Sequence, residues 1–200
     1  MQIKVISFMS TILLSVLAVV PFLPAIRGQF LFDDPYLFID TPPVASIRYR
    51  SIRQFRGDNR AMVHLFDGWL WRWFRVNDTG MDATGTVIIQ PSFPWHVLSI
   101  LFHIGTTLAA WGLLGLVLAP WRALAAAAIF AVHPLQVGAV GYVSGRAGIQ
   151  SAFFGMLGLL HIAAGGWHWA AVPVCFYFAY KSKQDGLLYA AWAPLILWAR

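Results

Sequence analysis

The chain is built from apolar segments that are each about as long as a membrane is thick. Residues 5–26 form the first such segment, 93–118 the second, and 121–140 and 147–166 the third and fourth. A helix of about 20 apolar residues crosses the hydrocarbon core of a bilayer. Of the 200 residues, 59% are hydrophobic and 11% are charged, whereas soluble domains are about one quarter charged. The sequence therefore predicts an all-α integral membrane protein.

Two shorter apolar segments follow at 167–180 and 187–200, so we expect five or six membrane helices in total. Pro21 and Pro24 are expected to kink or end the first helix, because proline lacks the backbone donor that a helix needs. A signal peptide is the competing interpretation of this first segment. It is long for that role and has no small-x-small cleavage site.

Most charged residues lie in one stretch, 27–92, which we expect to be a long loop. Within it, residues 63–76 read VHLFDGWLWRWFRV and carry an apolar stripe at helical spacing, formed by Phe66, Trp69, Leu70 and Trp73. Tryptophan-rich amphipathic helices with arginines beside the apolar face lie in the bilayer interface. We also expect a short helix at 46–56 and a turn-rich loop at 77–86.

The formal net charge of +6 favours contact with anionic lipid or phosphate. Nucleic acid is not a partner that the sequence supports, because no recognisable nucleic-acid motif accompanies the charge. Charge alone leaves the orientation open, since the positive-inside rule weakens for loops of about 60 residues.

An aspartate pair, Asp33 and Asp34, follows the first apolar segment in the text FLFDDPYLFID. A carboxylate at the mouth of a membrane cavity can act as general base for a hydroxyl nucleophile. A solvated turn, favoured by Pro35, is an equally good interpretation from position alone.

The text FPWHVLSILFH places His96, Ser99 and His103 on one face of the second membrane helix. The two histidines are about 10 Å apart along the helix axis, too far for both to bind one metal ion. The stripe therefore either faces a cavity or forms two interhelical hydrogen bonds. No spacing in the chain suits a structural zinc site, and we expect no metal.

Residues 131–148 read AVHPLQVGAVGYVSGRAG and combine a break at His133-Pro134 with a glycine-rich connection and one arginine, Arg146. An unwound segment at membrane depth is tolerated where protein or a water-filled cavity covers it. Arg146 is expected either to hold a phosphate or to extend toward the lipid headgroups. The text GYVSG does not match the G-x-S-G of rhomboid-type intramembrane proteases, which excludes that class.

Residues 181–186 read KSKQDG and separate two short apolar segments. Lys181, Lys183 and Asp185 lie here. The lysines are expected either to pair with an anionic substrate or to flank the helix ends.

The order of these motifs resembles the membrane portion of class C glycosyltransferases. The nearest branch is the protein O-mannosyltransferase-like group, which includes the tetratricopeptide-repeat-containing transmembrane O-mannosyltransferases and bacterial relatives. The resemblance covers nearly the whole chain, and HPLQVGAVGYVSGRAG is its most specific part.

The resemblance implies a single GT-C-like module over 1–200, with 27–92 as its first extracytoplasmic loop. Such enzymes move a sugar, here a mannose-like or other hexose, from a polyprenyl-phosphate carrier to a hydroxyl of a protein or glycan. No cofactor is obligatory. A bacterial inner membrane is the implied location.

The resemblance also assigns roles to residues. Asp33 or Asp34 is the base. The lipid phosphate is held by basic residues, for which Arg146, Lys183 and Lys181 are the candidates. The residues expected near the cavity are His96, His103, His133 and Asp185.

Three positions depart from the pattern of this family. Gly138 and Gln184 stand where glutamate is usual, and Ser99 stands where asparagine is common. Asp185, next to Gln184, is the candidate to compensate in part for the missing glutamate. The chain ends within its sixth apolar segment. These departures favour a second hypothesis, a catalytically inactive or partner-dependent membrane scaffold that retains lipid-phosphate binding. A transporter is a weaker alternative, since no inverted repeat is visible.

Overall fold

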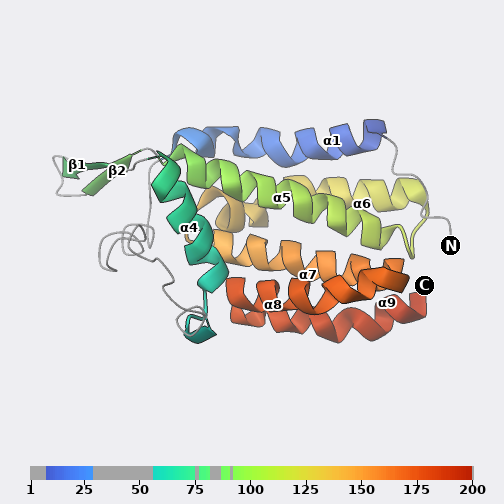
Figure 1. Ribbon diagram of the computed structural model, residues 1–200. Coiled ribbons are helices and arrows are strands. Elements are labelled where there is room, and N and C mark those ends of the chain that lie inside the picture. The colour runs from blue at the N-terminus through green and yellow to red at the C-terminus, as the bar shows by residue number, and fades with distance from the viewer. Residues whose placement is uncertain (1–7, 29–55, 75–76, 82–86, 91, 200) are drawn as a thin grey trace.

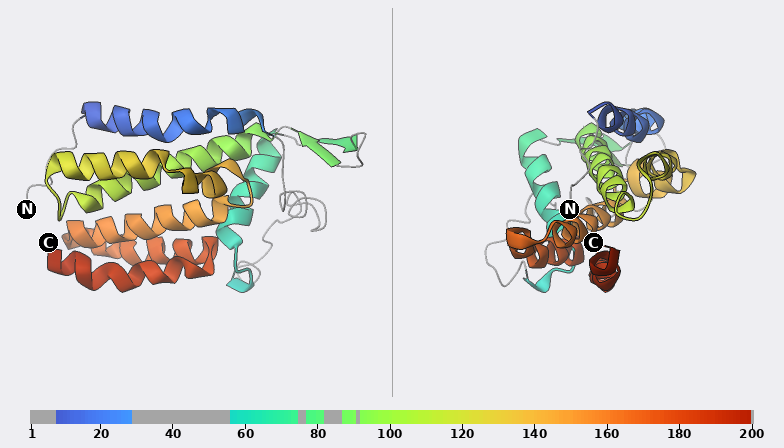
Figure 2. Two further views of the ribbon diagram at one scale, coloured as in Figure 1. Left: turned by 180° about the vertical axis from the view of Figure 1, so that it is seen from behind. Right: turned by 90° about the vertical axis from the view of Figure 1, so that its right-hand side faces the viewer.

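The computed structural model in Figure 1 describes residues 8–28, 56–74, 77–81, 87–90 and 92–199. Apart from one short hairpin, the described residues that have regular structure are helical. The long helices run side by side as a bundle, and each reverses the direction of the one before it (Figures 1 and 2). In chain order the bundle contains α1 (Phe8–Val19), α5 (Phe93–Leu114), α6 (Pro120–Val132), α7 (Arg146–Ala164), α8 (Val172–Ser182) and α9 (Ala193–Ala199).

Three helical segments are long and apolar enough to cross a membrane: Phe8–Arg27, Phe93–Leu114 and Arg146–Ala164. The pair Pro120–Val132 and Pro134–Gly141 passes the same test when taken together and is bent by 48°, which makes a fourth span if the pair crosses as one. The chain is thus an integral membrane protein. The last two of the six expected membrane helices do not meet this length criterion within the described residues.

The last two segments nevertheless run along the bundle in Figure 1. The first is α8, preceded by the 3₁₀ helix η5 (Gly166–Ala171). The second is α9, preceded by the 3₁₀ helix η6 (Gln184–Trp192). Gly165, with φ of 69°, ends α7 in the left-handed region and turns the chain toward η5.

Proline positions explain where two helices stop. The α-helical part of the first segment ends at Val19, and Pro21 and Pro24 fall in the 3₁₀ helix η1 (Val20–Arg27). Similarly, α6 ends at Val132, before His133-Pro134. The 3₁₀ helix η3 (Pro134–Gln136) and the π-helix η4 (Val137–Gly141) follow. Both breaks confirm the prediction from sequence.

The surface carries the apolar side chains that a bilayer accommodates. Phe8, Ile129 and Leu101 are more than half exposed on the spanning helices. Exposed tryptophans occur at both ends of the bundle, with Trp69 and Trp73 at one end and Trp121, Trp167 and Trp198 at the other. Tryptophan is enriched at the two membrane–water interfaces, and these positions fit a bundle that crosses a membrane.

Helix α4 (Ala61–Phe74) crosses one end of the bundle rather than running along it (Figures 1 and 2). We call this the α4 end. The predicted helix is confirmed over residues 63–74. Of the stripe expected to face the bilayer interface, Trp69 and Trp73 are exposed, whereas Leu70 is buried. The buried face instead contains Ala61, Met62, Val63 and Asp67 together with Leu70.

A two-stranded antiparallel hairpin extends beyond the α4 end. It pairs β1 (Asn77–Met81) with β2 (Val87–Gln90). The prediction of a loop at 77–86 is wrong for Asn77–Met81. The β-branched run in Val87–Gln90 favours a strand, and pairing with it holds the turn-forming residues of β1 in extended form. Residues 46–55, where a short helix was expected, lie outside the described part of the chain.

Small residues allow the helices to approach closely. Ala123, Ala127 and Ala131 form one fully buried stripe on α6, which is typical of helix packing in membranes. At Gly186, a side chain would collide with the backbone of Ala179, so only glycine lets η6 approach the end of α8 so closely. The bundle is therefore tightly packed where it supports the α4 end.

Candidate functional site

A buried ion pair joins α4 to the bundle. The side chain of Asp67, on α4, accepts hydrogen bonds from the Nη2 group of Arg146, the first residue of α7, and from Nε1 of Trp95 on α5, the latter at 2.9 Å. Arg146 and Trp95 are completely buried, and Asp67 is 3% exposed. Three elements that are distant in sequence thus meet at one carboxylate.

The environment of Asp67 changes its acidity. Burial raises the pKa of the Asp67 carboxyl above its ordinary value, because the charged form is removed from water. The positive charge of Arg146 and its hydrogen bond lower the pKa in return, and His64 and the N–H of Trp95 act in the same direction. The net direction is upward, so Asp67 takes up a proton at higher pH than an exposed aspartate does.

Arg146 keeps further donors beyond its bond to Asp67. Its Nε and Nη1 groups have no hydrogen-bond partner among the described residues. Both polar atoms of Gln150 are also without a partner there, and Gln150 lies one turn further along α7 and is completely buried. Residues four apart share one helix face. A buried polar group without a partner is costly, so this face of α7 suits a ligand or ordered water that supplies acceptors.

Of the two alternatives for Arg146, extension to the headgroups is wrong, because the side chain is completely buried. Its counter-ion, Asp67, was not predicted from the sequence. Asp67 is the single acidic residue inside the apolar run of the α4 helix, one turn after Val63 and one turn before Leu70. Two signals together could have identified the pair. One is an acidic residue inside an apolar helix, and the other is an arginine at the start of an apolar segment.

The predicted polar face of α5 is buried as expected. His96 is 2% exposed, and Ser99 and His103 are completely buried. The Nε2 group of His103 donates to the backbone carbonyl of Ala131 on α6, at 2.9 Å. This is the interhelical hydrogen bond that the sequence left as one of two alternatives. Ser99 donates instead to the carbonyl of Trp95 in its own helix.

His96 lies beside the point where the first long segment ends. Its Nε2 atom is 3.6 Å from the position that a Cβ atom on Gly28 would take. The hydroxyl of Ser92 donates to the Gly28 carbonyl at 2.6 Å. The start of α5 therefore holds the chain at Gly28, where the stretch that contains Asp33 and Asp34 begins. Those two aspartates lie outside the described residues.

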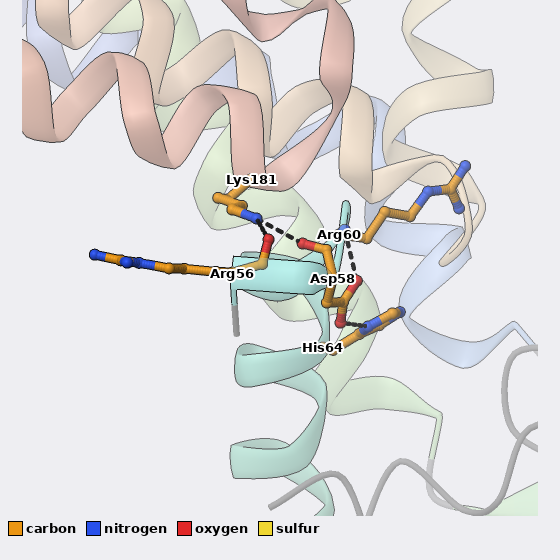
Figure 3. Close-up of polar contacts among 5 residues, drawn as sticks. All are labelled: Arg56, Asp58, Arg60, His64 and Lys181. Carbon is orange, nitrogen blue, oxygen red and sulfur yellow. Dashed lines mark hydrogen bonds and ion pairs between the residues drawn. The ribbon is translucent and has the colours of Figure 1, made fainter. Parts of the chain in front are cut away.

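Lys181 has a different environment from the one expected of an exposed phosphate ligand. It is 3% exposed, and its Nζ donates to the backbone carbonyls of Arg56 at 2.6 Å and Asp58 at 2.9 Å (Figure 3). Its ammonium also lies over the rings of Tyr177 and Tyr180. Lys181 thus ties the segment before α4 to the end of α8.

Asp58 organises the turn that leads into α4. One carboxylate oxygen accepts from the backbone N–H of Arg60 at 2.8 Å, and the other lies 2.6 Å from Nδ1 of His64 (Figure 3). Together with the two bonds from Lys181, these contacts position the first turn of α4. The side chain of Asp67, two turns further along, is therefore presented to Arg146 by a helix that is held at its start.

The remaining candidates are on the surface. Lys183 pairs with Asp185 at 2.9 Å, and both are largely exposed at the α4 end. His133 is exposed, and its Nδ1 accepts from the N–H of Leu135 as the cap of η3. Its ring thus caps the helix break, and its expected place near the cavity stays a prediction. In the described part of the chain, no three potential metal ligands come together.

The fold and this cluster define an integral membrane protein with a buried charge pair at the α4 end of its bundle. Comparison with protein-family models, with curated proteins and with solved structures found no match for the chain.

Proposed function

We propose that this protein is a membrane glycosyltransferase module that moves a hexose from a polyprenyl-phosphate carrier to a hydroxyl of a protein or glycan. The proposal starts from the resemblance of its motifs to class C glycosyltransferases. One observation carries it further: Arg146, the residue that the resemblance assigns to the lipid phosphate, is completely buried and has two donor groups without a partner among the described residues.

The proposed reaction needs a general base and a positive group that stabilises the leaving phosphate. A carboxylate of Asp33 or Asp34 removes the proton of the acceptor hydroxyl, and the oxygen forms a bond to the anomeric carbon of the sugar. The bond from that carbon to the phosphate oxygen breaks, and the polyprenyl phosphate leaves with the electron pair. Arg146 stabilises the negative charge that develops on the phosphate. Because the phosphate is already a good leaving group, no metal is required.

The position of Gly28 supports this pairing of base and phosphate ligand. Asp33 follows Gly28 by five residues, and a chain of that length spans at most about 18 Å. Gly28 is held to Ser92, beside His96 at the α4 end. Arg146 and the exposed pair Lys183 and Asp185 are at this same end. We therefore expect the base and the phosphate ligands to reach one bound substrate.

The proposal places the α4 end on the extracytoplasmic face of a bacterial inner membrane. In this role the exposed tryptophans of α4 keep that helix at the membrane surface, where a lipid-linked sugar presents its phosphate. His96 and His103 lie on the buried polar face of α5.

The test is transfer of radiolabelled sugar from polyprenyl-phosphate-mannose and polyprenyl-phosphate-glucose, in membranes that contain only this chain. The wild type is compared with Asp33→Asn/Asp34→Asn and with Asp40→Asn, which removes a charge from the same stretch of sequence. We expect label with the wild type and Asp40→Asn and none with the double variant. Transfer by the double variant would show that the base is assigned wrongly.

A second candidate function is an inactive or partner-dependent scaffold that binds the lipid phosphate. It is favoured by the ion pair itself, since Arg146 already has a carboxylate partner in Asp67, and by Gly138 and Gln184 at positions where the resemblance expects glutamate. Absence of label from folded, inserted wild-type protein that still binds polyprenyl phosphate would support this alternative.

A further inference from the structure

The bond between Asp67 and Arg146 places a negative charge where the proposed substrate would bring another. Asp67 uses one terminal nitrogen of the guanidinium, and Nε and Nη1 remain without a partner among the described residues. A phosphate that reaches the free groups would lie next to the Asp67 carboxylate. Two like charges in a site that excludes water repel each other strongly. The carboxylate and a bound phosphate therefore compete for one arginine.

We propose that Asp67 is a resident counter-ion of Arg146 that competes with the phosphate of a lipid, and that it sets how tightly this site holds the lipid. The inference rests on the proposed function for the class of ligand, a lipid-linked phosphodiester. It adds a residue to the site that the motifs do not include, on a helix of the first loop.

The counter-ion also explains how Arg146 can remain in place without a substrate. A completely buried guanidinium with no opposing charge is very unfavourable. Asp67 neutralises it, and Trp95 holds the carboxylate by a second hydrogen bond at 2.9 Å. When a phosphate takes over the guanidinium, Asp67 is left with Trp95 and becomes neutral by taking up a proton from water. Lipid binding and proton uptake are then linked, and binding is tighter at lower pH.

Several other charged or titratable groups surround the pair. His64 is one turn before Asp67 on α4, and His96 follows Trp95 on α5. Arg146 on α7 stays charged, and Lys181 on α8 contacts the segment before α4 rather than Asp67 itself. Because two histidines lie near the pair, the His64→Gln variant and variants of Asp67 are used to assign the effect.

The experiment measures binding of radiolabelled farnesyl methyl phosphate to the full chain in detergent micelles. This phosphodiester carries one negative charge that does not titrate between pH 5 and pH 7, and it has no sugar to transfer. Farnesol, the neutral alcohol, controls for binding through the hydrocarbon chain. Dimethyl phosphate, added as a competitor, distinguishes a site for any phosphodiester from one that needs the lipid.

We expect Asp67→Asn to bind the probe about tenfold more tightly than the wild type, because a like charge is removed from beside the anion. Arg146→Gln and Arg146→Gln/Asp67→Asn should lose this binding. Asp78→Asn is the matched control, since it removes one negative charge from the hairpin that extends beyond the α4 end, and it should bind as the wild type does. Binding by Asp67→Asn at or below wild-type affinity, or by Arg146→Gln at wild-type affinity, would overturn the proposal.

A second measurement does not depend on the folding of Asp67→Asn. In the His64→Gln variant, affinity for the probe should increase between pH 7 and pH 5, and unchanged affinity would count against the counter-ion role. Failure of the sugar-transfer assay together with tighter binding by Asp67→Asn would reject the enzyme but retain the counter-ion. Sugar transfer that depends on Arg146, without any effect of Asp67→Asn on binding, would retain the enzyme but reject the counter-ion role of Asp67.

Discussion

Asp67 of α4 and Arg146 of α7 are 79 positions apart in the sequence and form an ion pair that is almost completely shielded from solvent. The pair connects the helix of the long first loop to a membrane-spanning helix. Its energetic role can be separated from any role in binding, because both side chains can be replaced together.

Replacing Asp67 by alanine should destabilise the protein by about 3–5 kcal/mol, since it leaves a buried guanidinium without a counter-ion. The free energy of unfolding can be measured by titration with sodium dodecyl sulfate in mixed micelles. The matched variant Asp67→Leu/Arg146→Met removes both charges and should recover most of this loss. A loss below about 1 kcal/mol for Asp67→Ala would show that the pair contributes little.

Replacing Lys181 by methionine should release the segment before α4. The ammonium donates to two backbone carbonyls, and hydrogen bonds from charged groups contribute about 1.5–3 kcal/mol each. We expect faster amide hydrogen exchange in the first turn of α4 and unchanged exchange in α5. Lys183→Met is the control, because Lys183 is half exposed and makes only a surface ion pair. Equal exchange in the two variants would contradict this account.

Replacing His103 by leucine should cost about 1 kcal/mol in the free energy of unfolding, the usual scale of interhelical hydrogen bonds in membranes. The variant removes the bond to the Ala131 carbonyl and keeps the apolar volume. Thr107→Val is a matched change on the same helix. The Thr107 hydroxyl is buried and has no partner among the described residues, so its removal should be neutral or stabilising. A larger loss in the free energy of unfolding for Thr107→Val than for His103→Leu would reject the role assigned to the His103 hydrogen bond.

A spin label at Trp69 tests whether the outer face of α4 lies against lipid. The label is attached to Trp69→Cys in a Cys175→Ser background, and its relaxation by oxygen and by a water-soluble nickel complex is compared. Oxygen concentrates in lipid, so we expect it to dominate at Trp69, which is 52% exposed. A label at Asn59→Cys, in the exposed turn before α4, should respond mainly to nickel. Nickel dominance at both positions would place α4 away from the membrane.

Much of the fold follows from patterns that are local in the sequence. The spanning helices, the helix end before Pro21 and Pro24 and the break at His133-Pro134 were all predicted. Each depends on hydropathy over a helix-length window or on the backbone chemistry of one proline. The amphipathic helix of the first loop was also predicted, but not that its other face, which contains Asp67, packs against the bundle.

The site was predicted less well, for a physical reason. The sequence suggests candidates for holding a phosphate, among them Arg146, which lies at the α4 end. The sequence does not indicate which of these side chains already have a hydrogen-bond partner within the protein. Lys181 is used to hold the segment before α4, and His133 caps a helix at the surface. These roles depend on backbone carbonyls and amides, which every residue carries and no motif records.

The sequence by itself determined that this is a membrane protein of helical spans with one polar segment, because burial in lipid constrains long contiguous runs of residues. Only the tertiary structure decided that Asp67 and not a headgroup faces Arg146, and that Trp95 completes the contact. Helix packing brings these partners together from distant parts of the chain. A buried charge must be paired with a group that is close in space, and the sequence does not show which group that is.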